Sequence, residues 1–153
     1  MKPYAAHVSL RWSDMDAYAH INNVQFLRLL EDARVIGFRD WFGQDRSLLD
    51  EGVLVARHEI EYRSPLGFRH EPVEIQMWVS RIGGAGFEVA YIVTDPEGVG
   101  DGPDGQRTIY AVAETELALY DFASATPRRM SPDERETLGQ LLGDPAPFRR
   151  RRQ

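Results

Sequence analysis

The chain has 153 residues, of which 42% are hydrophobic and 27% are charged, and its formal net charge is −6. This length suffices for one domain with a buried core, and the acidic balance argues against a general nucleic-acid binder, because such a surface repels phosphates. The absence of cysteine excludes disulfides, thiolate metal sites and cysteine nucleophiles.

The ends of the chain show no membrane signal. The opening residues, MKPYAAHVSLRW, lack an apolar core of signal-peptide length, and no run approaches the roughly 20 apolar residues of a membrane-spanning helix. A cytoplasmic protein without membrane contact is therefore expected.

Residues 143–153 include four consecutive arginines and are expected to form a flexible basic tail of a single domain over 1–153. A contact of these arginines with a ligand phosphate or a neighbouring subunit is the alternative.

The first predicted elements are a strand and a long helix. Residues 7–12 alternate and predict a half-buried strand, with one face formed by Val8, Leu10 and Trp12. From Asn22 or Asn23 to about Phe42, apolar residues cover more than half of a helix circumference. Such a helix is expected to be wrapped by other structure, with an asparagine capping its start and Gly43 at its end.

Four further strands are predicted after this helix, each from alternating apolar and polar residues. Pro65 and Gly67 break the chain after the first of them, Gly83 and its neighbours form a hairpin turn, and 96–106 is a Gly/Asp/Pro loop. The inward-facing residues are expected to be Leu54, Ala56, Ile60 and Tyr62 in 53–62; Val73, Ile75, Met77 and Val79 in 73–80; alternate residues of 87–95; and Ile109, Ala111, Ala113, Leu117 and Leu119 in 108–121.

A short C-terminal helix completes the predicted set. In SPDE, Ser131 caps the helix, Pro132 takes the first helical position and Glu134 reaches back, and the helix runs to about Leu142. The sum is an α+β domain, in which five antiparallel strands bury one face against one long helix. A sheet curled around a single helix leaves long edges, which favours edge-to-edge dimerisation.

Polar residues gather between the first strand and the helix start. Asp14, Asp16 and His20 precede a helix N-terminus, where unpaired N–H groups and the helix dipole stabilise negative charge. Such a place can hold the oxyanion of an attacked carbonyl. A nearby carboxylate can attack that carbonyl or take a proton from the attacking water. These residues therefore indicate either a hydrolase for an activated acyl group or ordinary capping aspartates.

The segment RWSDMDAYAHINNVQFLRLLEDAR, residues 11–34, resembles the opening motif of hotdog-fold acyl-CoA thioesterases of the 4-hydroxybenzoyl-CoA thioesterase type. The resemblance continues through EIEYRSPL, VSRIGGAGFE, AETELALYD and RRMSPDER, and so covers roughly residues 8–140. It implies the hotdog fold, a five-stranded antiparallel sheet wrapped around one long central helix. It also implies a homodimer or a dimer of dimers, with active sites at the dimer interface.

The resemblance assigns roles by position. Asp16 matches the catalytic carboxylate, as nucleophile or general base, and the backbone N–H of Asn23 matches the donor that polarises the thioester carbonyl. The implied reaction hydrolyses an acyl-CoA, or an acyl carrier protein thioester, to a free acid and a thiol, with no metal and no cofactor. Many relatives have glycine where this chain has Ala19, and alanine there costs about 1 kcal/mol if the position needs a positive φ.

The other candidates each have more than one interpretation. Asp14 is expected to be a turn or capping carboxylate, and His20 either orients the loop, contacts substrate or simply packs. Glu31 lies roughly where a related hotdog group carries its catalytic carboxylate, and a salt bridge with Arg28 or Arg34 is the alternative. Candidates for substrate binding, which can equally be capping, solvent-facing or packing residues, are Asn22, Arg57, His58, Tyr62 and Arg63.

Two other functions compete with thioester hydrolysis. One is a non-catalytic hotdog protein that binds acyl-CoA or serves in assembly, against which the presence of Asp16 argues. The other is hydration of enoyl thioesters, which uses a differently spaced motif that this sequence lacks. Fold does not fix the substrate, so aryl, short-chain, branched and long-chain acyl groups all remain open.

Overall fold

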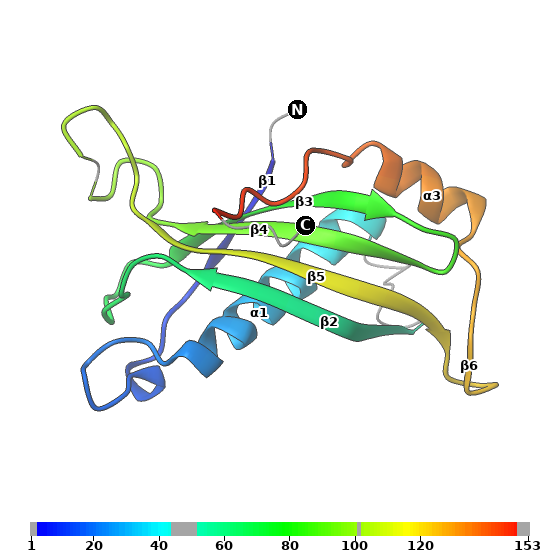
Figure 1. Cartoon of the computed structure of the whole chain (residues 1–153), viewed down its shortest axis with the longest axis horizontal. Coiled ribbons are helices and arrows are strands. Elements are labelled where there is room, and N and C mark those ends of the chain that lie inside the picture. The colour runs from blue at the N-terminus through cyan, green and yellow to red at the C-terminus, as the bar shows by residue number, and fades with distance from the viewer. Residues whose placement is uncertain (1–2, 44–51, 101, 150–153) are drawn as a thin grey trace.

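The computed structural model describes residues 3–43, 52–100 and 102–149. Figure 1 shows one long helix crossing one face of a twisted sheet, with a short helix at an end of that sheet. The elements are β1 (Tyr4–Val8), the 3-10 turn η1 (Trp12–Asp14), α1 (Asn23–Phe42), β2 (Val53–Tyr62), β3 (Val73–Ile82), β4 (Gly86–Thr94), β5 (Ile109–Asp121), β6 (Thr126–Pro127) and α3 (Pro132–Gly139).

The sheet has the strand order β1-β3-β4-β5-β2, and β6 adds a two-residue pairing to β5. All neighbouring strands are antiparallel. This arrangement, with α1 against one face, confirms the predicted hotdog fold. The helix start and the end of β2 lie at the same end of the molecule (Figure 1).

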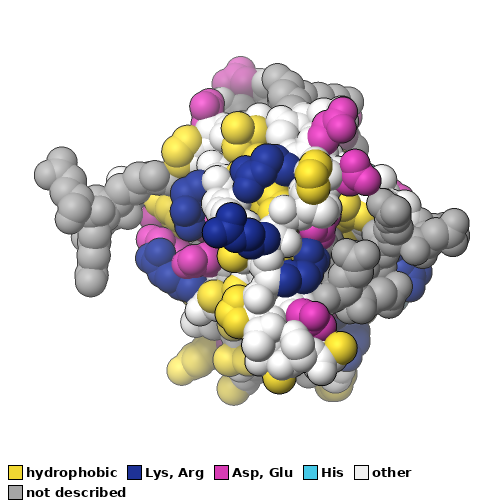
Figure 2. All heavy atoms as spheres, turned by 90° about the vertical axis from the view of Figure 1, so that its right-hand side faces the viewer, with side chains coloured by type: hydrophobic (Ala, Val, Ile, Leu, Met, Phe, Trp, Pro, Cys, Tyr) yellow, Lys and Arg dark blue, Asp and Glu magenta, His cyan; other side chains and the backbone are white. Residues whose placement is uncertain are grey.

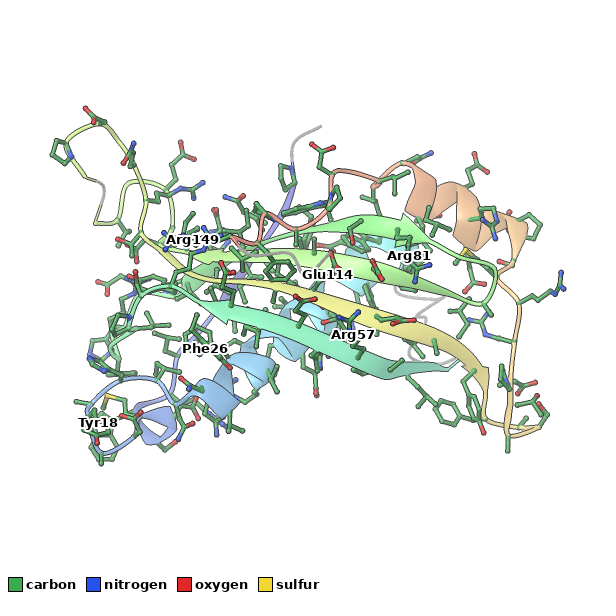
Figure 3. The ribbon with its side chains drawn as sticks, in the orientation of Figure 1. Tyr18, Phe26, Arg57, Arg81, Glu114 and Arg149 are labelled. Carbon is green, nitrogen blue, oxygen red and sulfur yellow. The ribbon has the colours of Figure 1, made fainter. Side chains whose placement is uncertain are left out.

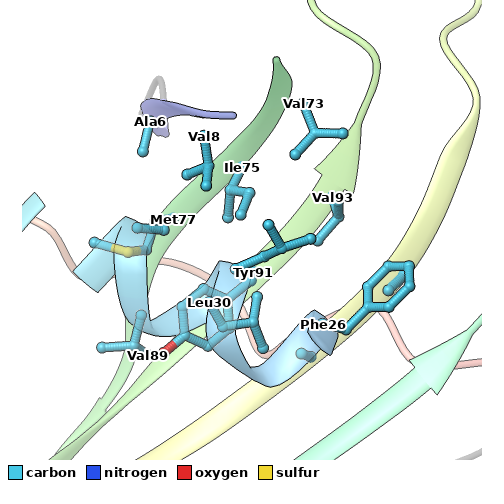
Figure 4. Packing of buried hydrophobic residues seen from close by; sticks show 14 of the residues in the cluster. Ala6, Val8, Phe26, Leu30, Val73, Ile75, Met77, Val89, Tyr91 and Val93 are labelled. Carbon is cyan, nitrogen blue, oxygen red and sulfur yellow. The ribbon is translucent and has the colours of Figure 1, made fainter. Parts of the chain in front are cut away.

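The core lies between α1 and the inner faces of β3, β4 and β5. Figure 4 shows Phe26 and Leu30 of α1 facing Met77, Tyr91 and Val93 of the sheet. The predicted inward face of β3 is confirmed, since its four apolar residues are completely buried. Each fully buried aliphatic side chain contributes about 1.5 to 3 kcal/mol relative to leaving it in water, so this face anchors the helix.

Gly37 allows α1 to approach the sheet closely. A Cβ atom at this position would lie 2.3 Å from Cε of Met77 and 3.3 Å from Cε1 of Tyr4. Real Cβ contacts are not as short as the first of these, so glycine suits the point where the helix crosses β1 and β3.

The first strand differs from its prediction. β1 ends at Val8 and the turn η1 begins at Trp12. The chain has therefore left the strand before it reaches Trp12, the third residue predicted to face inward. Val8 and Leu10 are buried as expected, but Trp12 is 72% exposed. The alternation therefore holds for two residues and ends where the turn begins.

The prediction for β2 is also partly wrong. A β-bulge between Val55 and Arg57 shifts the register with β5, so Val55, rather than Leu54 or Ala56, shares a face with Ile60 and Tyr62. No residue of β2 is fully buried, because β2 is an edge strand of the sheet. In β5, Ile109 packs against a small separate cluster with Trp78 and Val112, and not against α1.

The C-terminal strap, residues 140–149, first pairs with the edge of β3 at Val79 and then packs on the outer face of the sheet, where Ala146 and Phe148 join Trp78. Backbone bonds of 3.0 and 2.8 Å join Val79 to Leu141 and Gly143, and Nε1 of Trp78 donates to the Asp144 carbonyl at 2.6 Å. The expectation of a flexible tail from residue 143 is therefore wrong for residues 143–149, and residues 150–153 lie outside the described residues. The capping box of Ser131 and Glu134 is confirmed, although α3 ends at Gly139.

Figure 2 shows the end of the molecule that carries the β3–β4 turn and α3, where several basic side chains gather. Arginines in this region have local acceptors: Arg81 pairs with Glu88 at 3.2 Å, Arg128 with Glu134 at 2.8 Å, and Arg135 donates to the Gly83 carbonyl at 3.1 Å. Within the described ranges, no helix combines the length and apolar character needed to cross a membrane.

Candidate active site

Asp16 lies in a tight loop between η1 and α1. Its backbone N–H donates to the His20 carbonyl at 2.8 Å, and the Ala19 N–H donates to the Asp16 carbonyl at 3.1 Å. The Asp16 side chain accepts through Oδ1 from the N–H groups of Tyr18 at 2.9 Å and His20 at 3.3 Å. The described residues donate no hydrogen bond to its Oδ2, so one carboxylate oxygen is held by the loop and the other is available.

Ala19 has a φ of 60°. This value lies in the left-handed region, which favours glycine and costs a non-glycine residue about 1 kcal/mol. A positive φ at Ala19 was the condition under which alanine would be costly, and the structure shows that the loop adopts this conformation.

The start of α1 supplies the second element of the site. Asn22 is the N-cap, and its side chain accepts from the Val24 N–H at 3.1 Å. Asn23 is the first helical residue, and none of the described residues accepts a hydrogen bond from its backbone N–H. A free donor at the positive end of a helix dipole is suited to a carbonyl oxygen that gains negative charge.

These two elements meet in one open pocket of about 300 Å³. Its lining consists of Asp16, His20, Ile21, Asn23, Phe26, Tyr62, Arg63, Ser64, Pro65 and Leu66. Figure 3 shows Tyr18 on the Asp16 loop and Phe26 on the adjoining part of α1, close to the end of β2. The pocket therefore contains both members of the predicted catalytic pair and three of the other candidates.

Tyr62 joins the end of β2 to the helix start. Its hydroxyl donates to the Asn23 carbonyl at 2.9 Å, and its ring packs edge-on against Phe26 at a centroid distance of 5.3 Å. Burial raises the pKa of the Tyr62 phenol, so the hydroxyl stays protonated at neutral pH and keeps its role as donor.

Arg63 lines the pocket, but its guanidinium group donates hydrogen bonds to residues that do not line it. Its Nε donates to Glu61 at 2.9 Å and its Nη2 to the Pro147 carbonyl at 2.6 Å, in the C-terminal strap. The Arg149 N–H also bonds Glu61, at 3.2 and 3.1 Å to its two oxygens. The strap thus brings Arg149 next to Glu61, which also pairs with Arg63.

The remaining candidates do not line the pocket. Glu31 lies eight residues beyond Asn23, about 12 Å along the helix at about 1.5 Å per residue. Arg57 pairs with Glu59 at 3.2 Å on the outer face of the sheet. His58 lies on the inner face, where its Nδ1 is 2.8 Å from Oγ1 of Thr115. Burial lowers the pKa of His58, the charge of Arg34 lowers it further, and Glu31 opposes them.

The arginines expected to pair with Glu31 have other partners. Arg28 pairs with Asp14 at 2.6 Å and with Asp32 at 2.5 Å. Arg34 is buried and donates to the Tyr91 hydroxyl at 3.1 Å. The prediction that one of these arginines pairs with Glu31 is therefore wrong.

Asp14 was expected to be a turn or capping carboxylate; it lies in the turn η1 and does not cap a helix. Its carboxylate is buried between Arg11 and Arg28. Hydrogen bonds from Arg11 and then from Arg28 lower the pKa of Asp14 despite its burial, so this side chain is an anion at neutral pH.

Sequence reasoning missed the apolar part of the lining. The helical pattern identifies Phe26 only as a core residue, and Pro65 is expected only as a chain break. Ser64 and Leu66 belong to the RSPL segment that carries part of the resemblance, which was the available signal for them. Among the described residues, no group of three or more histidines, aspartates and glutamates is placed to hold a metal ion.

The fold and the pocket define a hotdog protein with a carboxylate beside the N-terminus of its central helix. A family model, the Thioesterase-like superfamily, matches residues 10–141. The chain belongs to this family. A search of curated protein sequences gives no match.

Solved structures show the same fold. A predicted thioesterase from Bacillus stearothermophilus has a TM-score of 0.75 at 19% identity, over 93% of this chain and 98% of that one. A thioesterase from Thermus thermophilus, complexed with coenzyme A and Zn, has a TM-score of 0.73 at 24% identity, over 94% and 97%. A thioesterase superfamily protein from Jannaschia sp. CCS1 has a TM-score of 0.76 at 14% identity, over 92% and 94%.

Proposed function

We propose that this protein hydrolyses an acyl-CoA thioester to a free carboxylic acid and coenzyme A. The observation that carries the proposal is that Asp16 and Asn23 line the same pocket, and none of the described residues accepts a hydrogen bond from the backbone N–H of Asn23. One supplies a carboxylate and the other a donor for a developing oxyanion, which are the two groups that acyl transfer from a thioester requires.

In the proposed reaction, the Asn23 N–H binds the thioester carbonyl oxygen and the helix dipole stabilises its charge as the carbonyl carbon is attacked. Asp16 acts in one of two ways. As a nucleophile, it forms a mixed anhydride, expels the thiolate and is regenerated by water. As a general base, it takes a proton from the attacking water and passes it to the leaving thiolate. Both routes consume one water and yield one acid and one thiol.

Four further observations support this assignment. The chain belongs to the Thioesterase-like superfamily, and the thioesterase from Thermus thermophilus was crystallised with coenzyme A. The second oxygen of Asp16 is free of the loop that holds the first. Phe26 and Leu66 give the pocket an apolar wall next to these polar groups, as an acyl group requires.

The working form that we propose is a homodimer or a dimer of dimers joined through β2. This strand is a sheet edge, and Val55 is 45% exposed on it. Edge strands offer unpaired backbone groups to a second copy. At the helix start, Val24 is 68% exposed, and a second copy would cover such apolar surface near the pocket.

The test is coenzyme A release, followed with a thiol-trapping dye, from a panel of aryl-CoAs and C2 to C16 acyl-CoAs. Turnover that exceeds the uncatalysed rate on part of the panel is expected, and the preferred member identifies the acyl class. Acyl-CoA binding without turnover on any member would contradict hydrolysis and favour a binding protein. The same panel on acyl carrier protein distinguishes the two thiol carriers.

A further inference from the structure

Asp14 is a buried charged group that the proposed reaction does not use. The residue is 3% exposed, and both of its carboxylate oxygens are occupied. Arg11 donates to Oδ1 from Nη2 at 2.8 Å and from Nε at 3.1 Å, and Arg28 donates to Oδ2 from Nη2 at 2.6 Å. One carboxylate therefore joins the end of the first chain segment to the second turn of α1.

The backbone of Asp14 is tied to the same region. Its carbonyl accepts from the Asn22 N–H at 2.9 Å, and Met15 pairs with Ile21 in an antiparallel bridge just beyond. The loop that carries Asp16 is thus closed at its base by Asp14. Asp16 lies two residues after this anchor, and Asn23 lies one residue after its hydrogen-bond partner Asn22.

We propose that Asp14, held by Arg11 and Arg28, is a positioning residue for the reaction. It fixes the separation between the Asp16 carboxylate and the Asn23 N–H, without touching the substrate. This inference rests on the proposed function. Catalytic groups must be held to within a fraction of an ångström, because a misplacement of about 1 Å can lower a rate about 100-fold.

Binding both Arg11 and Arg28 depends on the negative charge of Asp14. A neutral asparagine at this position keeps the shape and one acceptor oxygen, but it cannot bind two guanidinium groups as a carboxylate does. Arg28 also contacts Asp32, which is more exposed and lies one turn further along α1. Without the Asp14 charge, Arg28 keeps its ion pair with Asp32 and ties the helix less firmly to the base of the loop.

The chain offers a matched pair of variants to test this. Asp14→Asn and Asp32→Asn each remove one carboxylate from the same arginine, but only the first removes the anchor of the loop. On the preferred acyl-CoA, Asp14→Asn is expected to lower kcat about 10- to 100-fold, with KM changed by less than about threefold. Asp32→Asn is expected to leave both within about twofold of the wild type.

A second readout does not depend on turnover. Hydrogen exchange at the amides of Asp16, Ala19 and Asn22 is expected to speed up at least about tenfold in Asp14→Asn, and to stay unchanged in Asp32→Asn, while the strand core of both variants stays protected. The positioning role is overturned by unchanged exchange in Asp14→Asn, by an unchanged kcat despite faster exchange, or by equal effects of the two variants. Absence of turnover in the wild type would refute the proposed function instead. In that case, unchanged loop exchange in Asp14→Asn would also refute the anchor.

Discussion

Ala19 holds the loop of the candidate site in a left-handed conformation, with a φ of 60°. The hydrogen bonds that surround Asp16 require this turn, since the Ala19 N–H and the His20 N–H both point back to Asp16. The loop therefore accepts a local backbone cost in order to fold around the carboxylate.

Ala19→Gly is expected to stabilise the protein by about 0.5 to 1 kcal/mol, because glycine relieves the strain at a positive φ by more than it raises the entropy of the unfolded chain. Urea unfolding measures the difference. Ala17→Gly is the control, since Ala17 is exposed in the same loop without a positive φ; it is expected to lose stability. A loss of stability in both variants would contradict the strain at Ala19.

At the level of single residues, the sequence predicted the polar members of the candidate site better than the apolar ones. Asp16 and Asn23 were found because a motif with fixed spacing carried them. Phe26 was missed as a pocket residue because an aromatic residue at helical spacing has the same pattern whether it fills the core or lines a cavity. Asp14 was recognised as structural, but its partner Arg28 is fourteen residues away, and pattern alone does not show such a contact.

Among the helices and strands, α1 is the one whose local sequence most directly shapes the candidate site. Asn22 caps the helix through its side chain, and the cap sets where the free N–H of Asn23 lies. A disordered first turn would remove both the donor and the dipole that support an oxyanion.

Asn22→Ala is expected to destabilise the protein by about 1 kcal/mol, and Asn22→Ser by much less, because serine also caps helices well. Thermal unfolding of the three proteins checks this. The same variants separate capping from the predicted substrate binding: pure capping predicts that Asn22→Ser retains the wild-type KM. A raised KM in Asn22→Ser with unchanged stability would show instead that the amide contacts substrate.

The elements were predictable to the extent that local rules determine them. The period of α1, the capping box of α3 and the inward face of β3 follow from neighbouring residues and were confirmed. The inner face of β2 was wrong because a bulge changes the parity of a strand, and nothing in an alternating pattern marks where the bulge falls. The C-terminal strap was missed because tertiary contacts with Trp78 order it.

For the whole molecule, the proposed assembly depends on β2. It is a ten-residue edge strand beside the pocket, and its partly exposed apolar residues are unusual for an edge that stays free. Long exposed edges that present apolar side chains tend to pair with another chain.

A mass of twice 17.4 kDa, or a multiple of that dimer, is therefore expected in solution by light scattering. Val55→Lys places a charge on the edge and is expected to give monomers with strongly reduced turnover. Leu142→Lys is the control, because Leu142 is similarly exposed but lies on the C-terminal strap; it is expected to retain the wild-type mass. A monomeric wild type with full activity would contradict the proposed assembly.

The most direct test of the proposed mechanism is the steady-state rate of Asp16→Asn on the preferred acyl-CoA, beside wild type and Glu31→Gln. We expect kcat/KM to fall by about 100-fold or more in Asp16→Asn, in the range expected for loss of a nucleophile or general base. We expect a change of less than about threefold in Glu31→Gln, because Glu31 lies about two turns along α1 from the Asn23 N–H. Turnover that survives in Asp16→Asn and collapses in Glu31→Gln would contradict this mechanism.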